Sequence, residues 1–130
     1  MDTASSIGRS AGDGGETNFG IERRSEADGT ARLILRGELD MATQDALREA
    51  LLAEQRAGSA VVVVLDQLDY LDSAGIGELV EGCDRARRGG RDFAVTPGTG
   101  NVRRVLWISG FLTHLCGTTE PAERAAPRMS

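Results

Sequence analysis

Short apolar runs in this chain alternate with segments in which apolar residues recur at helical spacing. In residues 31–36, Ala and Leu alternate with Arg and Ile, which is typical of a strand with one face more buried than the other. Residues 60–65 hold four valines between Ala and Leu, without polar alternation, as expected for a strand covered on both faces. Two further strands are predicted over 19–25 and over 92–96, the last of which ends at Pro97.

Three helices are predicted between these strands and after them. The first begins at Thr43, whose side chain can cap it, and ends near Gly58. The second follows 70–73 and stops at Gly89, and the third runs between a capping Thr99 and Gly110. We expect the apolar residues that come next to pack back onto the sheet: Phe111, Leu112 and Leu115.

The resulting order, β-β-α-β-α-β-α, predicts an α/β fold with a mixed, mainly parallel sheet of about four strands and helices packed against it. Residues 1–18 are rich in Gly, Ser, Asp and Thr, and residues 117–130 hold two prolines with several alanines and charges. Such segments bury too little apolar surface to offset their ordering entropy, so we expect both to be disordered. The folded domain is then 19–116.

The net charge and the lengths of the apolar runs exclude some classes of function. A formal net charge of −5 argues against a general nucleic-acid binder, which usually carries a basic face. The N-terminus has no basic region followed by an apolar stretch, and the longest apolar run is far short of the ~20 residues of a membrane helix. We therefore expect a cytoplasmic protein without a membrane segment. All basic residues are arginine, a bias that fits a GC-rich bacterial genome.

Candidate chemistry gathers in two loops that follow predicted strands. In 72–77, Ser73 stands where a loop becomes a helix, so the partly positive helix end would suit a phosphoryl group on it. Gly75 and Gly77 would let another backbone approach. In 37–40, Asp40 lies at the mouth of the neighbouring strand. Plainer interpretations stay open, because Ser73 can be a simple helix cap and Asp40 a solvated loop carboxylate.

Catalysis is not expected from these loops. No basic residue beside Ser73 would activate it, and the single histidine, His114, has no evident Ser-His-Asp arrangement. The aspartates at 40, 66, 69 and 72 do not match a calcium loop, and the Gly75 loop lacks the lysine of a P-loop. We expect no cofactor, no metal site and no enzymatic activity. An acidic loop with one serine suits a kinase substrate better.

Four motifs in order make the sequence similar to a known family: 37–40 (GELD), 72–77 (DSAGIG), 89–91 (GGR), and 101–106 (NVRRVL) together with 109–111 (SGF). The chain resembles the STAS-domain anti-sigma factor antagonists over about 19–116. The resemblance implies that Ser73 is phosphorylated by a partner anti-sigma factor kinase. The family's frequent second hydroxyl is Ala74 here. The expected kinase-binding surface comprises Asp40, Thr43, Asp72, Ala74, Gly75 and Gly77.

The resemblance also implies a mechanism of partner switching in a stress response. The unphosphorylated protein would bind the anti-sigma kinase and release a sigma factor for transcription, phosphorylation of Ser73 would reverse this, and a phosphatase would reset the cycle. The alternative is a STAS scaffold that is not phosphorylated, as a subunit of a stress-sensing or lipid-transport complex. Trp107 lies off the apolar stripe of its helix and is either a further contact residue or partly buried against the chain end.

Overall fold

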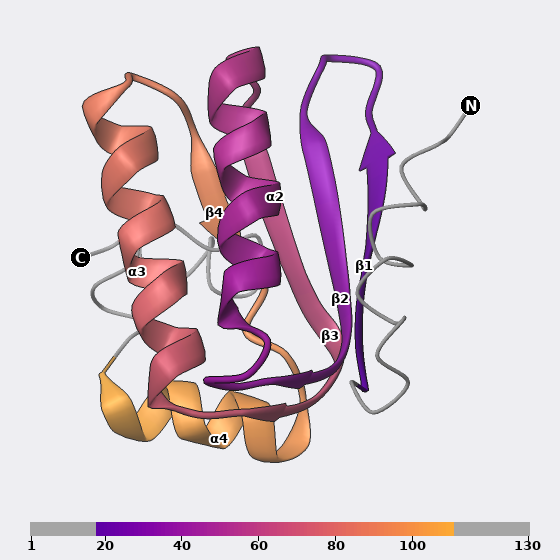
Figure 1. The fold of residues 1–130 in the computed structure, drawn as a ribbon, viewed down its shortest axis with the longest axis vertical. Helices are drawn as coiled ribbons and strands as arrows, with labels where there is room; N and C mark the ends of the chain where they lie inside the picture. The colour runs from indigo at the N-terminus through magenta and orange to yellow at the C-terminus, as the bar shows by residue number, and fades with distance from the viewer. Residues whose placement is uncertain (1–17, 111–130) are drawn as a thin grey trace, which may run out of the picture.

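In the part of the chain that the structure describes, four strands form one sheet in the order β1-β2-β3-β4, and three helices pack against it. The structure is a computed structural model that describes residues 18–110. Figure 1 shows the elements β1 (Phe19–Ser25), β2 (Ala31–Leu39), α2 (Gln44–Ala57), β3 (Val61–Leu71), α3 (Ser73–Arg88), β4 (Phe93–Val95) and α4 (Gly100–Ser109).

The element order and the mixed sheet agree with the sequence prediction. β1 and β2 are antiparallel around the turn at Gly29, and β2, β3 and β4 are parallel. The strand boundaries differ, because β2 continues beyond Arg36 and β3 beyond Leu65. The pairing of β2 and β3 passes through two register shifts. β2 keeps its two-residue alternation of burial up to Leu39, whereas β3 loses it.

Gly37 marks one of these irregular positions. Its φ is +89°, and a Cβ there would lie 1.7 Å from the carbonyl oxygen of Asn18. Glycine is therefore required, because only glycine combines that dihedral angle with so close a backbone approach. The next residue, Glu38, donates its N–H to the same Asn18 carbonyl at 2.8 Å. The two bulges thus let β2 reach Leu39 while it stays paired to β1 and β3.

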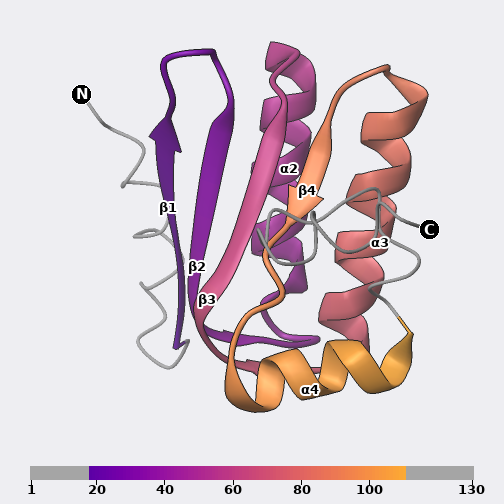
Figure 2. The same ribbon diagram turned by 180° about the vertical axis from the view of Figure 1, so that it is seen from behind.

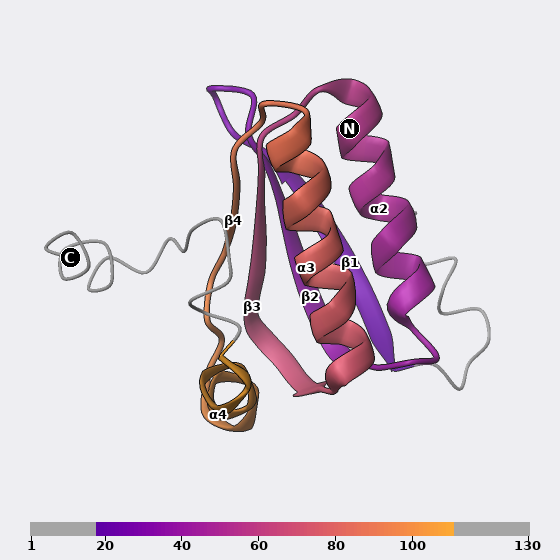
Figure 3. The same ribbon diagram turned by 90° about the vertical axis from the view of Figure 1, so that its left-hand side faces the viewer.

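The core lies between the sheet and the helices α2 and α3, which cover one face (Figure 3). The fully buried leucines at this interface come from both strands and helices: Leu33, Leu35, Leu39, Leu47, Leu65, Leu71 and Leu79. α4 lies across the end of the sheet at which β2 and β3 finish (Figures 1 and 2), and its Val102 and Leu106 join the same core.

An ion pair joins β1 to α2 at the edge of this core. Arg23 donates to both carboxylate oxygens of Glu54, at 2.5 and 3.1 Å. The Glu54 side chain is buried, whereas Arg23 is partly exposed. Because the guanidinium is hydrogen-bonded to this carboxylate, the pKa of Arg23 is raised above its usual value.

Some predictions lie outside the described residues. The first is the predicted disorder of residues 1–18 and 117–130, of which only residue 18 is described. The second is the predicted packing of Phe111, Leu112 and Leu115 onto the sheet. Among the helices of residues 18–110, none has the length and apolar character needed to cross a bilayer.

Candidate functional site

The two loops predicted to carry the chemistry lie next to each other. Leu39 at the end of β2 pairs with Leu71 at the end of β3, and the Asp72 N–H donates to the Leu39 carbonyl at 3.3 Å. The β2–α2 loop and the start of α3 therefore leave the sheet from the same edge. Residues separated by about thirty positions in sequence form one surface, which we call the switch edge (residues 40–43 and 69–77).

Ser73 is the first residue of α3, and its side chain is exposed. Asp72, rather than Ser73, is the N-cap, since its carboxylate accepts the N–H groups of Ala74 and Gly75 at 3.0 and 3.1 Å. The Asp72 carbonyl accepts the Ile76 N–H at 3.0 Å and so starts the helical hydrogen bonding. The Ser73 hydroxyl has no hydrogen-bond partner among residues 18–110, which leaves it accessible to another protein.

The capping role of Asp72 refines what a phosphoryl group on Ser73 could contact. From the sequence, we expected a phosphoryl group on Ser73 to contact the unpaired N–H groups at the start of the helix. In the structure the Asp72 carboxylate already accepts two of these donors. A phosphate on Ser73 would therefore either displace this carboxylate or remain directed into solvent. In both cases it would add negative charge beside an existing one.

Asp40 and Thr43 fold the second loop of the switch edge onto itself. The Asp40 carboxylate accepts the N–H groups of Ala42 and Thr43 at 3.0 and 3.2 Å. The Thr43 hydroxyl is buried, lies 2.8 Å from the Glu38 carbonyl oxygen and accepts the Asp40 N–H at 2.9 Å. Thr43 occupies the N-cap position of α2 as predicted, but its side chain makes no capping bond, because the loop uses its hydroxyl.

The two glycines of the site differ in their surroundings. Gly75 is buried, and a Cβ there would lie 2.7 Å from a methyl group of Leu71 and 2.8 Å from Cγ of Leu39. Gly77 is exposed and has nothing within 4 Å of such a Cβ. Gly75 thus lets the helix start pack onto the sheet, while Gly77 leaves a smooth helix surface that another molecule could approach.

The six predicted contact residues fall into two groups. Asp40, Asp72 and Ala74 are partly exposed and Gly77 is exposed, whereas Thr43 and Gly75 are buried and position the others. Sequence reasoning missed two apolar side chains of the same edge: Met41 is 73% exposed and Tyr70 is 42% exposed. The signal for Met41 was a large apolar residue in a short loop, directly after the polar Asp40. Tyr70 gave no signal, because the strand was predicted to end before it.

The acidic residues of this region do not converge on Ser73. The Asp66 carboxylate accepts the Thr96 hydroxyl at 2.9 Å, which directs it toward the β4 side of β3. Asp69 is exposed on the last part of β3. Within residues 18–110, no three Asp, Glu, His or Cys side chains form a group that could hold a metal ion.

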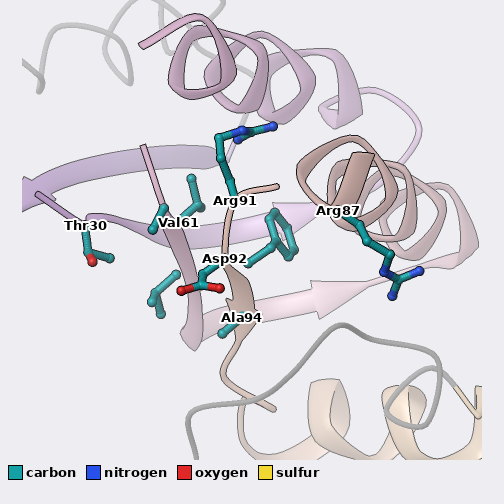
Figure 4. Close-up of a pocket in the computed structure, with 9 residues that line it drawn as sticks. Thr30, Val61, Arg87, Arg91, Asp92 and Ala94 are labelled. Carbon is teal, nitrogen blue, oxygen red and sulfur yellow. The ribbon is translucent and has the colours of Figure 1, made fainter. Parts of the chain in front are cut away.

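A shallow cavity of about 480 Å³ lies at the other end of the parallel strands (Figure 4). Residues at the starts of β2, β3 and β4 line it, among them Thr30, Val61 and Asp92. Its two arginines have other roles: Arg91 donates to the backbone carbonyls of Ser59 and Arg85, and Arg87 pairs with Asp84. The cavity is therefore separate from the switch edge, and its basic groups are already engaged.

Comparison with known proteins agrees with this architecture. The family model described as "Mlab, STAS domain" matches residues 22–116. A putative anti-sigma factor antagonist from Thermotoga maritima is 17% identical with a TM-score of 0.67, covering 81% of this chain and 91% of its own. An anti-sigma factor antagonist from Mycobacterium paratuberculosis is 23% identical with a TM-score of 0.65, covering 85% and 94%.

A further similar structure is the anti-sigma factor antagonist SpoIIAA of Bacillus in its unphosphorylated form. It is 19% identical with a TM-score of 0.63, and the match covers 85% of this chain and 97% of SpoIIAA. At these identities the solved structures establish the fold. The family match extends over most of the chain and includes the whole switch edge, so the protein belongs to the STAS-domain family.

Proposed function

We propose that this protein is an anti-sigma factor antagonist whose affinity for an anti-sigma factor kinase is set by phosphorylation of Ser73. The single observation that carries the proposal is the exposed Ser73 hydroxyl at the start of α3, on an edge that also presents Asp40, Met41 and Tyr70. Three structures with the same fold are described as anti-sigma factor antagonists, and SpoIIAA is known in a phosphorylated form.

In its unphosphorylated form the protein binds the kinase through the switch edge. Met41 and Tyr70 supply exposed apolar area, which interfaces use, while Gly77 lets the partner approach α3 closely. Binding displaces a sigma factor from the kinase, and transcription from its promoters begins. The kinase supplies ATP and its metal ion, so the antagonist itself needs no cofactor.

Phosphorylation of Ser73 dissociates the complex with the kinase through the negative charge that it adds at the interface. A phosphate adds about −1.5 to −2 charges at neutral pH. Here it lies next to Asp72, whose carboxylate already uses the nearest backbone donors. At a dehydrated interface this charge is costly, and a 100-fold loss of affinity needs only about 2.7 kcal/mol. The domain need not refold, and a phosphatase that removes the group restores binding.

The test compares the wild-type chain with Ser73→Ala and Ser73→Asp, each purified from the host under several growth conditions. Intact mass and peptide mapping report phosphate, and the retained proteins are identified by mass spectrometry. We expect a phosphate on Ser73, an ATP-binding anti-sigma factor retained by Ser73→Ala, and its loss with Ser73→Asp. Ser25→Asp is the matched control, since Ser25 is also exposed but ends β1, away from the switch edge.

A STAS scaffold without phosphorylation is the second candidate. It is favoured by the description of the matching family model, which names Mlab and no antagonist. This candidate predicts an unmodified Ser73 in every growth condition and the same retained proteins for wild type, Ser73→Ala and Ser73→Asp. That outcome would refute the switch.

A further inference from the structure

α4 presents an unusual surface to solvent. Trp107 is 70% exposed and Ile108 is 74% exposed, although large apolar side chains are normally buried. Arg104, one turn earlier, is exposed as well. Residues three and four positions apart are neighbours on a helix surface, so these three side chains form one contiguous group. We call Arg104, Trp107 and Ile108 the α4 patch.

The opposite side of α4 fixes the helix firmly. Val102 and Leu106 are almost completely buried in the main core. At the start of the helix, Gly98 lies so close to Val102 and Leu65 that a Cβ would be 2.8 Å from a Val102 methyl group. The α4 patch is therefore held by a rigid support. Exposed apolar groups on such a support are typical of binding surfaces, and Trp and Arg are enriched among the residues that dominate interface energies.

The α4 patch and the switch edge belong to the same end of the molecule. α4 crosses the end of the sheet at which β2 and β3 finish, and views from the front and from behind agree on this (Figures 1 and 2). Seen from the side, α3 starts on one side of that sheet end and α4 lies on the other (Figure 3). A protein bound over the end of β3 would therefore meet both surfaces.

We propose that the α4 patch is a second contact site for the same protein partner, one that meets it with apolar side chains and at least one carboxylate. This inference rests on the proposed function, because it takes the partner to be the one bound at the switch edge. The two surfaces carry opposite charges, because the switch edge is acidic and the α4 patch is basic. A partner that covers both must therefore present basic groups to the switch edge and acidic groups to the α4 patch. Ser73 is on α3 and the patch is on α4, so contacts to the patch would add to the affinity that the switch edge provides.

A protein fits this end of the molecule better than an anionic membrane does. An interfacial membrane helix also combines arginine with Trp and Ile, and it lies flat on the lipid. Here such a surface would also approach the carboxylates of Asp69 and Asp40 at the same end, in a chain of net charge −5. A protein can vary its charge over these distances, whereas a uniformly anionic lipid surface cannot.

The first test measures affinity by calorimetry, with the unphosphorylated full-length chain and the purified protein that Ser73→Ala retains. We expect Trp107→Ala and Ile108→Ser each to weaken binding at least about tenfold, and Arg104→Glu to weaken it with a reduced dependence on salt. Arg88→Glu is the charge-matched control at the far end of α3 and should change affinity less than twofold. Affinities equal to wild type for Ile108→Ser and Trp107→Ala, with unchanged melting temperatures, would overturn the inference.

A second measurement does not require the partner in advance. A photoreactive phenylalanine replaces Ile108 in one variant and Met41 in another, and each is irradiated in host cells. We expect both positions to crosslink to the same protein, identified by mass spectrometry. No crosslink from position 108, or a different protein, would overturn the inference. Two other results would also overturn the inference. In the first, the wild type sediments with phosphatidylglycerol vesicles, Trp107→Ala does not, and the affinity for the partner is unchanged. In the second, the wild type self-associates, Trp107→Ala does not, and the affinity for the partner is again unchanged.

The two proposals fail separately. If Ser73→Asp loses the partner and the α4 variants do not, the switch stands and the second contact site is wrong. If the α4 variants lose the partner and Ser73→Asp does not, the contact site stands and the phosphorylation switch is wrong.

Discussion

Adding one methyl group at Gly75 should destabilise the domain, whereas the same change at Gly77 should stabilise it slightly. In Gly75→Ala the new carbon would lie 2.7–3.0 Å from atoms of Leu71 and Leu39, both of which are fully packed in the core. Overpacking of this kind costs about 1–3 kcal/mol. In the unfolded chain, Gly→Ala lowers the conformational entropy and contributes about 0.4–1 kcal/mol in the opposite direction.

The net expectation for Gly75→Ala is a loss of stability of about 1.3 kcal/mol at the middle of both ranges, and of at most about 2.6 kcal/mol. Gly77→Ala has nothing within 4 Å of its new carbon, so it keeps only the favourable contribution. The two variants, made two positions apart on one helix, should therefore differ in the sign of their effect. For a domain of this size, each kcal/mol corresponds to a change of about 4–8 °C in Tm.

Urea unfolding followed by far-UV circular dichroism at 222 nm is the appropriate assay. Fluorescence of Trp107 is a poor probe, because this side chain is already 70% exposed in the folded state. Equal denaturant slopes for the variants would show that only stability has changed. A Gly75→Ala protein as stable as wild type, or a Gly77→Ala protein that loses as much as Gly75→Ala, would refute the packing argument.

Three further predictions concern charged groups. Asp72→Ala removes the N-cap of α3 and should lower the free energy of unfolding, measured in urea, by about 0.5–2 kcal/mol. Asp72→Asn can still cap the helix and should lower it less. Glu54→Ala leaves Arg23 without its buried partner and should lower the free energy of unfolding in urea by about 1–3 kcal/mol. This loss is smaller than that for a fully buried pair, because Arg23 is partly exposed. Hydrogen bonds from Arg24 and Arg36 lower the pKa of Glu22, so its stabilising effect is present above about pH 4.5 and is lost as the pH falls through the folded-state pKa. Thermal melts from pH 6 to pH 3 should therefore fall less steeply for Glu22→Gln, and identical slopes would contradict this.

The element order could be predicted from the sequence because local patterns determine it. Valines in a run, apolar residues at helical spacing and glycines after helices identified every strand and helix of residues 18–110. The end of β3 could not be predicted from local alternation, because burial along this strand does not alternate regularly. β2 does alternate as far as Leu39, but residues 37–40 were interpreted as a loop. The close approach of Gly37 to Asn18 keeps β2 in the sheet where its own sequence suggests a loop.

The adjacency of the two candidate loops could be predicted from the sequence, but the contacts within them could be predicted only in part. Parallel strands bring their carboxyl ends to one edge, so the neighbouring loops followed from the fold alone. The capping carboxylate could not be assigned, since Asp72 and Ser73 are both good caps in sequence and only the backbone geometry favours Asp72. The burial of Thr43 and Gly75 depends on tertiary packing against β2 and β3, which residue types do not encode.

The Thr43 hydroxyl is buried and hydrogen-bonded within the loop that Asp40 closes. In the two loops at residues 40–43 and 72–75, a serine/threonine kinase would consequently reach one aliphatic hydroxyl, that of Ser73. Each molecule could then exist in two states of modification at this edge, and a population of molecules would respond in simple proportion to the fraction modified. If Ser73 is phosphorylated as proposed, a threshold in the cellular response would have to arise from the enzymes that add and remove the phosphate, rather than from the number of modified sites on this edge.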